Sequence, residues 1–140
     1  MKRTNLIIMA ITAAVVLLSA CSPSAQAPDM AGTSWKLVSY GPNNDQTPAL
    51  EGVQTRLSFD PEGQVSGTFG CNSFGGDYSQ DGDTLTFGPL MATLMACDEA
   101  RNMQEMAGFA ALQGEVQFII DRDTLSIHTY DDVLLLYVRQ

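Results

Sequence analysis

QTRLSFDPEGQVSGTFGCNSFGGDYSQDGDTLTF, the stretch from Gln54 to Phe87, is the part of the chain that best indicates its fold. Apolar and β-branched residues come in short alternating runs, and each run is followed by residues that favour turns. Asp60-Pro61-Glu62-Gly63 places Pro and Gly where a type I turn favours them, and Asp81-Gly82 suits a turn with a positive φ angle. Short strands joined by such turns are typical of an antiparallel meander.

The same pattern extends to both sides of this stretch, from Ser34 to Arg139. The expected strands cover residues 34–40, 54–59, 64–69, 75–79, 84–87, 92–96, 116–120, 125–129 and 133–139. The connection from Gly41 to Gly52 contains two prolines and two adjacent asparagines, and we predict a surface loop there. Most of the domain should therefore be antiparallel sheet.

One segment, between Asp98 and Gln113, departs from the two-residue period. Four apolar residues recur in it at the spacing of a helix face: Met103, Met106, Ala107 and Ala110. Asp98 can cap the start of a helix, and Gly114 can stop it. We predict one helix whose Met-rich stripe packs on the sheet, although methionines at this spacing could instead form an adaptable binding surface.

The first 21 residues have a pattern of their own. Lys2 and Arg3 precede a 13-residue run, from Leu6 to Leu18, that contains a single polar residue. A membrane-spanning helix needs about 20 apolar residues, so this run is typical of a signal peptide. The tetrapeptide Leu18-Ser19-Ala20-Cys21 resembles the lipobox of bacterial lipoproteins, which implies cleavage before Cys21 and lipid attachment to it. An ordinary secretory signal with an incidental cysteine is the alternative.

The ten residues after Cys21, SPSAQAPDMA from Ser22 to Ala31, contain two prolines and no apolar periodicity, which indicates a tether. The expected organisation is a signal peptide at 1–20, a lipidated N-terminus and flexible tether at 21–31, and a folded domain at 32–140. Ser22 in place of Asp is similar to cargo forwarded to the outer membrane. We therefore expect a lipid-anchored protein in the cell envelope, at the periplasmic face of the outer membrane.

The charge of the chain limits its partners. Loss of Lys2 and Arg3 would leave five basic residues against 16 acidic ones, a net charge of −11. Nucleic acid is not an expected partner, because phosphate contacts need Lys and Arg. The charge would keep the domain soluble, and it could also attract a cationic partner.

Two cysteines remain if Cys21 carries lipid. Export would place Cys71 and Cys97 in an oxidising compartment, so we predict a disulfide that stabilises the fold by about 3 to 4 kcal/mol. Free buried thiols are the alternative. A metal site or a catalytic thiol is not expected, because the single histidine, His128, has no His or Cys near it in the sequence.

The segment from Gly67 to Tyr78, GTFGCNSFGGDY, is unusually rich in glycine. Glycines within a strand pattern indicate bulges, sharp bends or a close approach of the backbone. A phosphate-binding loop is not expected, because no Gly-Lys-Ser/Thr follows. We predict a corner where the sheet curls, with the side chain of Asn72 bound to the turning backbone.

Several short motifs occur together in a fixed order along the chain: Gly32-Thr33-Ser34-Trp35-Lys36-Leu37, Gly70-Cys71-Asn72, Gly76-Asp77-Tyr78, Thr93-Leu94-Met95-Ala96-Cys97, and Glu105 with Leu112. On these motifs, the chain resembles the META/HslJ family over nearly all of residues 32–139. This resemblance implies an α+β fold that is predominantly antiparallel β: a curled sheet or cracked barrel of about eight strands with one helix packed against it. The motif residues that we single out are Trp35, Gly70, Cys71, Asn72, Gly76, Tyr78, Thr93 and Cys97.

The family resemblance implies no established enzymatic activity, and no GxSxG or HExxH arrangement occurs in the sequence. We expect a protein without catalytic residues, cofactor or metal that acts as a binding or accessory module in envelope integrity or stress tolerance. One alternative is a carrier of a small apolar ligand, held between helix and sheet by Met103, Met106 and Phe109. The other is an inhibitor of a cationic hydrolase. The expected partners are the membrane, through the lipid, and an envelope protein or apolar ligand.

Overall fold

The computed structural model describes residues 27–140, so the predicted signal peptide and Cys21 lie outside the described residues. The elements are β1 (Thr33–Pro42), β2 (Thr47–Pro48), β3 (Arg56–Phe59), β4 (Gln64–Thr68), β5 (Ser73–Asp81), β6 (Thr84–Phe87), β7 (Met91–Ala92), α1 (Glu99–Ala111), β8 (Gly114–Asp121), β9 (Thr124–His128) and β10 (Val133–Arg139).

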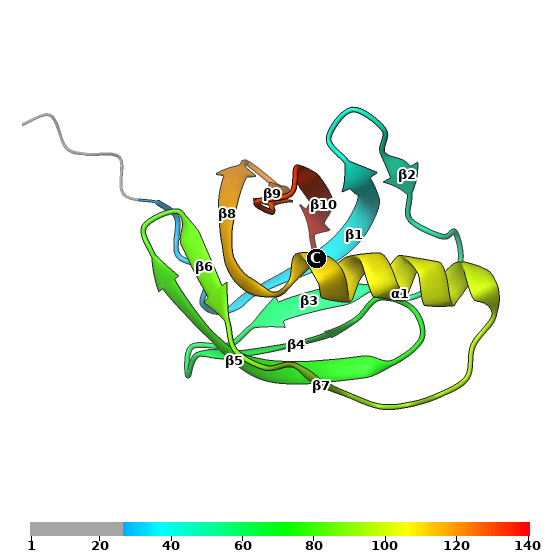
Figure 1. Cartoon of the computed structure of the whole chain (residues 1–140). Helices are drawn as coiled ribbons and strands as arrows, with labels where there is room; N and C mark the ends of the chain where they lie inside the picture. Colours follow the sequence, from blue (N-terminus) through cyan, green and yellow to red (C-terminus); the bar gives the residue numbers. More distant parts are fainter. Residues whose placement is uncertain (1–26) are drawn as a thin grey trace, which may run out of the picture.

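The eight longer strands form a closed antiparallel barrel (Figure 1). Its wall follows the order β1, β3, β4, β5, β6, β8, β9 and β10, and β10 returns to pair with β1. The short strand β2 pairs with β1, and β7 pairs with the first residues of β5. The prediction of a barrel-like sheet of about eight strands with one helix is therefore confirmed, and the β1–β10 pair closes the wall.

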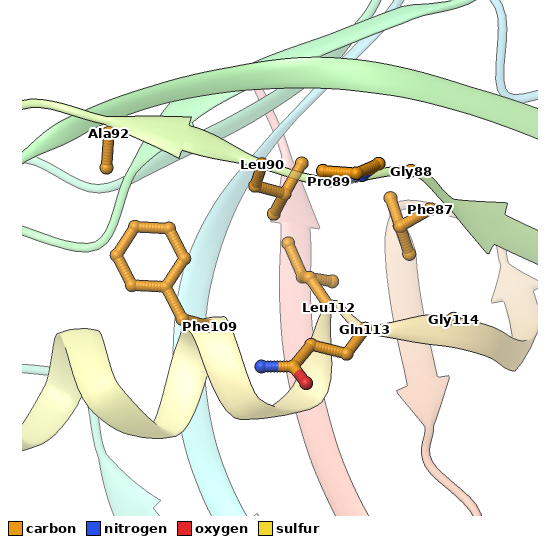
Figure 2. A pocket seen from close by; sticks show the side chains of 9 residues that line it. All are labelled: Phe87, Gly88, Pro89, Leu90, Ala92, Phe109, Leu112, Gln113 and Gly114. Carbon is orange, nitrogen blue, oxygen red and sulfur yellow. The ribbon is translucent and has the colours of Figure 1, made fainter.

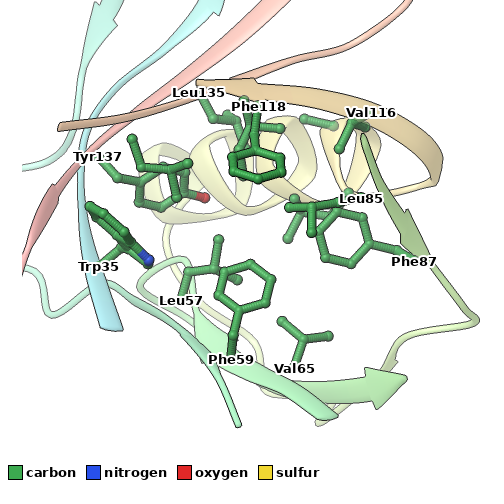
Figure 3. Packing of buried hydrophobic residues seen from close by; sticks show 14 of the residues in the cluster. Trp35, Leu57, Phe59, Val65, Leu85, Phe87, Val116, Phe118, Leu135 and Tyr137 are labelled. Atoms are coloured by element: carbon green, nitrogen blue, oxygen red, sulfur yellow. The ribbon is translucent and has the colours of Figure 1, made fainter. Parts of the chain in front are cut away.

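Alternate residues of the strands fill the barrel (Figure 3). Along β9, Leu125 and Ile127 are completely buried, as the two-residue period predicts. Aromatic side chains occupy much of the interior, and Trp35, Phe118 and Tyr137 are among the largest that are fully buried. Turn glycines behave as expected, since Gly82 has a φ of 59° between β5 and β6.

The packed part of the chain begins before Gly32. The side chain of Met30 is fully buried, and its backbone N–H donates to Oε1 of Gln80 at 2.9 Å. The predicted tether extends to Ala31, but Met30 already belongs to the packed domain. The chain enters the domain beside the β5–β6 turn, at the end of the barrel opposite α1 (Figure 1).

Helix α1 lies across the other end of the barrel, where it contacts β1 and β10. Asp98 caps it as predicted, because its carboxylate accepts from the N–H of Arg101 at 3.0 Å. The helix ends at Ala111, and Gly114, with a φ of 63°, turns the chain into β8. Within residues 27–140 no helix combines the length and apolar composition that a membrane span requires.

The predicted orientation of α1 is wrong. Met103 and Met106 are 61% and 71% exposed, so the Met-rich stripe faces away from the barrel. The buried residues of the helix are instead Gln104, Glu105, Gly108 and Ala111. This polar, small-residue face turns inward because it forms hydrogen bonds with the chain turns beneath it.

Two connections also differ from the predictions. The strand expected over residues 92–96 is limited to Met91–Ala92, because the residues that follow turn towards the side chain of Asn72. The surface loop expected over residues 41–52 contains strand β2, which folds back onto β1 as a short hairpin.

Candidate binding site

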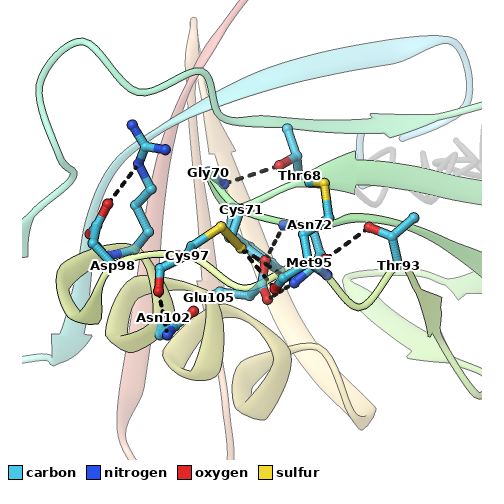
Figure 4. Close-up of a disulfide and its surroundings, with 12 residues drawn as sticks. Thr68, Gly70, Cys71, Asn72, Thr93, Met95, Cys97, Asp98, Asn102 and Glu105 are labelled. Carbon is cyan, nitrogen blue, oxygen red and sulfur yellow. Dashed lines mark hydrogen bonds and ion pairs between the residues drawn. A yellow bond between two sulfur atoms is a disulfide. The ribbon is translucent and has the colours of Figure 1, made fainter.

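A disulfide attaches the start of α1 to the barrel (Figure 4). It joins Cys71, in the turn between β4 and β5, to Cys97, and their Cα atoms lie 6.1 Å apart. The predicted pairing of these cysteines is confirmed. Because Cys97 directly precedes the N-cap Asp98, the disulfide helps to determine where the helix begins.

Asn72 connects three segments through its side chain (Figure 4). Its Nδ2 donates to Oε1 of Glu105 at 2.7 Å, and its backbone N–H donates to the other carboxylate oxygen at 2.5 Å. Its Oδ1 accepts from the N–H of Met95 at 2.7 Å and from the hydroxyl of Thr93 at 2.9 Å. The side chain of Asn72 therefore binds the backbone of the loop at Met95 and not that of its own turn, as was predicted, and Glu105 is its partner on the helix.

Gln104 forms a second buried link between α1 and the loops. Its Oε1 accepts from the N–H of Leu50 at 2.8 Å, and its Nε2 donates to the carbonyl of Phe69. Both groups of the amide are therefore satisfied, as a buried polar side chain requires. Gln104 could not be predicted from the sequence, because a polar residue of an amphipathic helix is expected on its exposed face. The family pattern did include Glu105 and Leu112.

Two motif glycines allow close approaches of the chain. Gly70 has a φ of 117°, and a Cβ there would overlap the side chain of Val53. A Cβ on Gly76 would lie 2.8 Å from Cδ2 of Leu90 and 2.9 Å from the carbonyl oxygen of Pro89. Gly76 thus lets the segment after β6 lie directly on β5.

The remaining motif residues, Trp35 and Tyr78, support the barrel away from the disulfide. Trp35 is fully buried, and its Nε1 donates to the hydroxyl of Thr33 at 2.8 Å. The hydroxyl of Tyr78 donates to the carbonyl of Asp60 at 3.0 Å. Burial, and to a smaller extent the carboxylates of Asp29 and Asp60, raise the pKa of Tyr78 above its ordinary value. The motif residues therefore do not form one site.

An apolar hollow opens beside the C-terminal half of α1 (Figure 2). Its volume is about 560 Å³, and its walls include Phe87, Pro89, Leu90, Ala92, Phe109 and Leu112. These residues come from two segments, 87–92 and 109–114, which the pairing of β6 with β8 brings together. Gln113 supplies a polar amide at the edge of the hollow.

The wall formed by Phe109 is held in place by aromatic packing. The Phe109 ring meets the rings of Phe69 and Phe74 edge to face, at centroid distances of 5.4 and 5.3 Å, and these two rings stack on each other at 5.0 Å. The apolar hollow is therefore preformed, and its size suits an apolar side chain or a small apolar molecule.

The hollow differs from the ligand site that the sequence suggested between helix and sheet. Of the three residues expected to hold an apolar ligand, only Phe109 lines it, whereas Met103 and Met106 lie on the exposed face of α1. Among residues 27–140, no group of three or more His, Cys, Asp or Glu side chains is arranged to hold a metal ion.

The closed barrel and its helix agree with comparisons to known proteins. A model of the META domain matches residues 28–140. The chain belongs to the META domain family. This META domain is similar to the NMR structure of a protein from Burkholderia xenovorans, with a TM-score of 0.68 and 24% identity over 83% of this chain and 93% of the other.

Two further solved structures share the fold of this META domain. A second NMR structure has a TM-score of 0.63 and 22% identity over 78% of this chain and 90% of the other. The crystal structure of a DUF4847 family protein from Bacteroides vulgatus has a TM-score of 0.58 and 12% identity over 78% of this chain and 93% of the other. At these identities the likeness concerns the fold alone. No curated protein matches the chain.

Proposed function

We propose that this META domain is a non-enzymatic binding module of the bacterial envelope, held by a lipid on Cys21 at the periplasmic face of the outer membrane. In this role it supports envelope integrity or stress tolerance by contacting another envelope component. The observation that carries the proposal is the apolar hollow beside α1, which is open and preformed. An apolar side chain of the partner enters it.

The energetics favour such a contact. Burial of a Leu- or Phe-sized side chain contributes about 1.5 to 3 kcal/mol. The aromatic cluster behind Phe109 and the network around Asn72 hold the walls in place, so little ordering is required on binding. The side chain acts as an anchor, and further contacts around the hollow supply the remaining affinity.

The position of the tether supports the same arrangement. The six peptide units between Cys21 and Ala27 can span at most about 20 Å when fully extended. The chain enters the domain at the end of the barrel opposite α1. A lipid on Cys21 would therefore keep that end near the membrane, and α1 with the hollow would face the periplasm.

Site-specific photo-crosslinking in the cells that produce the protein tests the proposal. A photoreactive residue at Gln113, on the edge of the hollow, should give a discrete product with another envelope protein, whereas one at Asp83, in the β5–β6 turn, should not. Ala92→Glu places a charge in the hollow and should abolish the product, and Thr86→Glu on an exposed position of β6 should not. Equal products at both positions, or a product insensitive to Ala92→Glu, would count against the hollow.

The lipid anchor is tested separately. Cys21→Ala should release the protein from the membrane fraction, and the intact mass of the natural protein should show cleavage before Cys21 and attached acyl chains. If the released variant fully complements a deletion strain under envelope stress, tethering is not part of the function.

A further inference from the structure

A second hollow lies on the other side of the C-terminal half of α1. Its volume is about 460 Å³, and its lining includes Ala107, Ala110, Gln113, Glu115, Tyr130 and Asp131. It shares Gln113 with the apolar hollow, so the two hollows are neighbours around the end of the helix. We call it the acidic hollow.

The charged side chains that line the acidic hollow are both carboxylates, those of Glu115 and Asp131. Both residues are exposed, and the ion pairs found within residues 27–140 involve neither of them. Their charges are thus available to a ligand, and a cation in the hollow would be attracted from two sides.

Two further features of the acidic hollow favour a positive charge. The last turn of α1 contains no basic residue, so the partial negative charge of the helix end is not compensated there. Tyr130, whose side chain is fully exposed, lines the same hollow and can offer its ring face to a cation. The helix end, the aromatic ring and the two carboxylates favour the same kind of ligand.

We propose that the acidic hollow binds a Lys or Arg side chain of the partner whose neighbouring apolar side chain enters the apolar hollow. The inference rests on the proposed function, and it adds the chemical class of the partner: a basic protein segment in which apolar and cationic residues are neighbours. A peptide fits the pair of hollows because adjacent side chains can pass on either side of Gln113. The acidic domain also attracts such a segment from a distance, which speeds association.

Calorimetric titration at low salt tests the inference with three acetylated, amidated pentapeptides. The first is Lys-Phe-Lys-Phe-Lys, the second replaces each Lys with norleucine, and the third replaces each Lys with Glu. We expect the Lys peptide to bind most tightly and the Glu peptide not to bind. Raising the salt concentration should weaken the Lys peptide and leave the norleucine peptide almost unchanged.

A matched pair of double variants identifies the charges responsible. Glu115→Gln with Asp131→Asn should weaken the Lys peptide roughly tenfold, whereas Asp81→Asn with Asp83→Asn, which removes the same charge at the opposite end of the barrel, should change its affinity less than twofold. Equal unfolding midpoints of the two variants show that the fold is intact. Equal affinities of the two variants for the Lys peptide would overturn the inference.

Variants of the neighbouring residues complete the test. Tyr130→Leu should weaken the Lys peptide several-fold and Tyr130→Phe should not, because only Phe keeps the ring face. Ala92→Glu should abolish binding of the norleucine peptide. If Ala92→Glu abolishes this binding while Glu115→Gln with Asp131→Asn leaves the affinity for the Lys peptide unchanged, the inference fails and the proposed function stands. If the affinity for the Lys peptide depends on the carboxylates of Glu115 and Asp131 but is unchanged by Ala92→Glu, the proposed function fails. If none of the three peptides binds, both the inference and the proposed function are contradicted.

Discussion

Replacement of Asn72 by Ala should destabilise the protein more than any substitution of an exposed polar residue. The change removes the donor to Glu105 and the acceptor for Met95 and Thr93, three hydrogen bonds that join α1 and its preceding loop to the barrel. The bond from the backbone N–H of residue 72 to Glu105 would remain. Glu105 is only 8% exposed, so its carboxylate would lose a partner that water cannot easily replace.

The magnitude follows from the kinds of bond that are lost. A hydrogen bond to a charged group contributes about 1.5 to 3 kcal/mol, and each of the two neutral ones contributes about 1 kcal/mol. Some relaxation around the smaller side chain reduces the total, so we expect the free energy of unfolding to fall by about 3 kcal/mol. With a urea dependence of about 1.5 kcal/mol per molar, the unfolding midpoint would decrease by roughly 2 M.

Urea unfolding followed by the fluorescence of the single tryptophan, Trp35, measures this effect, because its ring is buried in the barrel. Asn102→Ala is the matched control. Its Nδ2 donates to the carbonyl of Cys97 at 3.2 Å in an exposed position, so we expect a loss below about 1 kcal/mol. If Asn72→Ala lowers the free energy of unfolding no more than Asn102→Ala does, the hydrogen bonds of the Asn72 side chain do not attach the helix to the barrel.

Three further predictions concern stability. The Tyr137 hydroxyl is buried without a hydrogen-bond partner among the described residues, so Tyr137→Phe should raise the free energy of unfolding by about 1 kcal/mol at pH 7. Burial also raises the pKa of Tyr137 far above 10, so above pH 10 the unfolded chain loses the hydroxyl proton while the folded protein keeps it. The free energy of unfolding of the natural protein should then fall by up to about 1.4 kcal/mol per pH unit, and that of Tyr137→Phe should fall less steeply. Urea titrations at pH 7, 9 and 11 measure the difference. Gly108→Ala should lower the thermal midpoint by an amount equivalent to about 1 to 2 kcal/mol, because the new Cβ would overlap the Phe69 ring. Adding Phe69→Leu should relieve part of this effect. An unchanged thermal midpoint in Gly108→Ala would contradict the close contact. Replacing both Cys71 and Cys97 with Ala removes their disulfide and should lower the free energy of unfolding by about 3 to 4 kcal/mol. A reductant should destabilise the natural protein but not this double variant.

Several features of the fold could be predicted from the sequence because they depend on neighbours in the chain. The turn at Asp81-Gly82 and the cap at Asp98 are local, and the structure contains both. The face of α1 could not be predicted in this way. A stripe of apolar side chains is the usual inward face, but here hydrogen bonds to the loops outweigh it, and they place Gln104 and Glu105 inside.

The apolar hollow could not be predicted from the sequence patterns either, because its residues come from two segments about 20 positions apart. Phe109 was predicted to contact an apolar ligand, but the Pro89–Leu90 wall opposite it depends on the pairing of β6 with β8. The acidic hollow corresponds to no pattern in the sequence. Glu115 and Asp131 have no distinguishing pattern in an acidic chain, and the antiparallel pairing of β8 with β9 brings their segments together at one cavity beside α1.

The amino-acid sequence by itself determined the strand pattern, the turns, the single helix, the disulfide and the membership in the META domain family, because each depends on short-range periodicity or on a small set of spaced residues. The tertiary structure decided which face of the helix is buried and where the surface is hollow. Those features arise from contacts between distant segments, and such contacts form only when the barrel closes and buried polar groups find their partners.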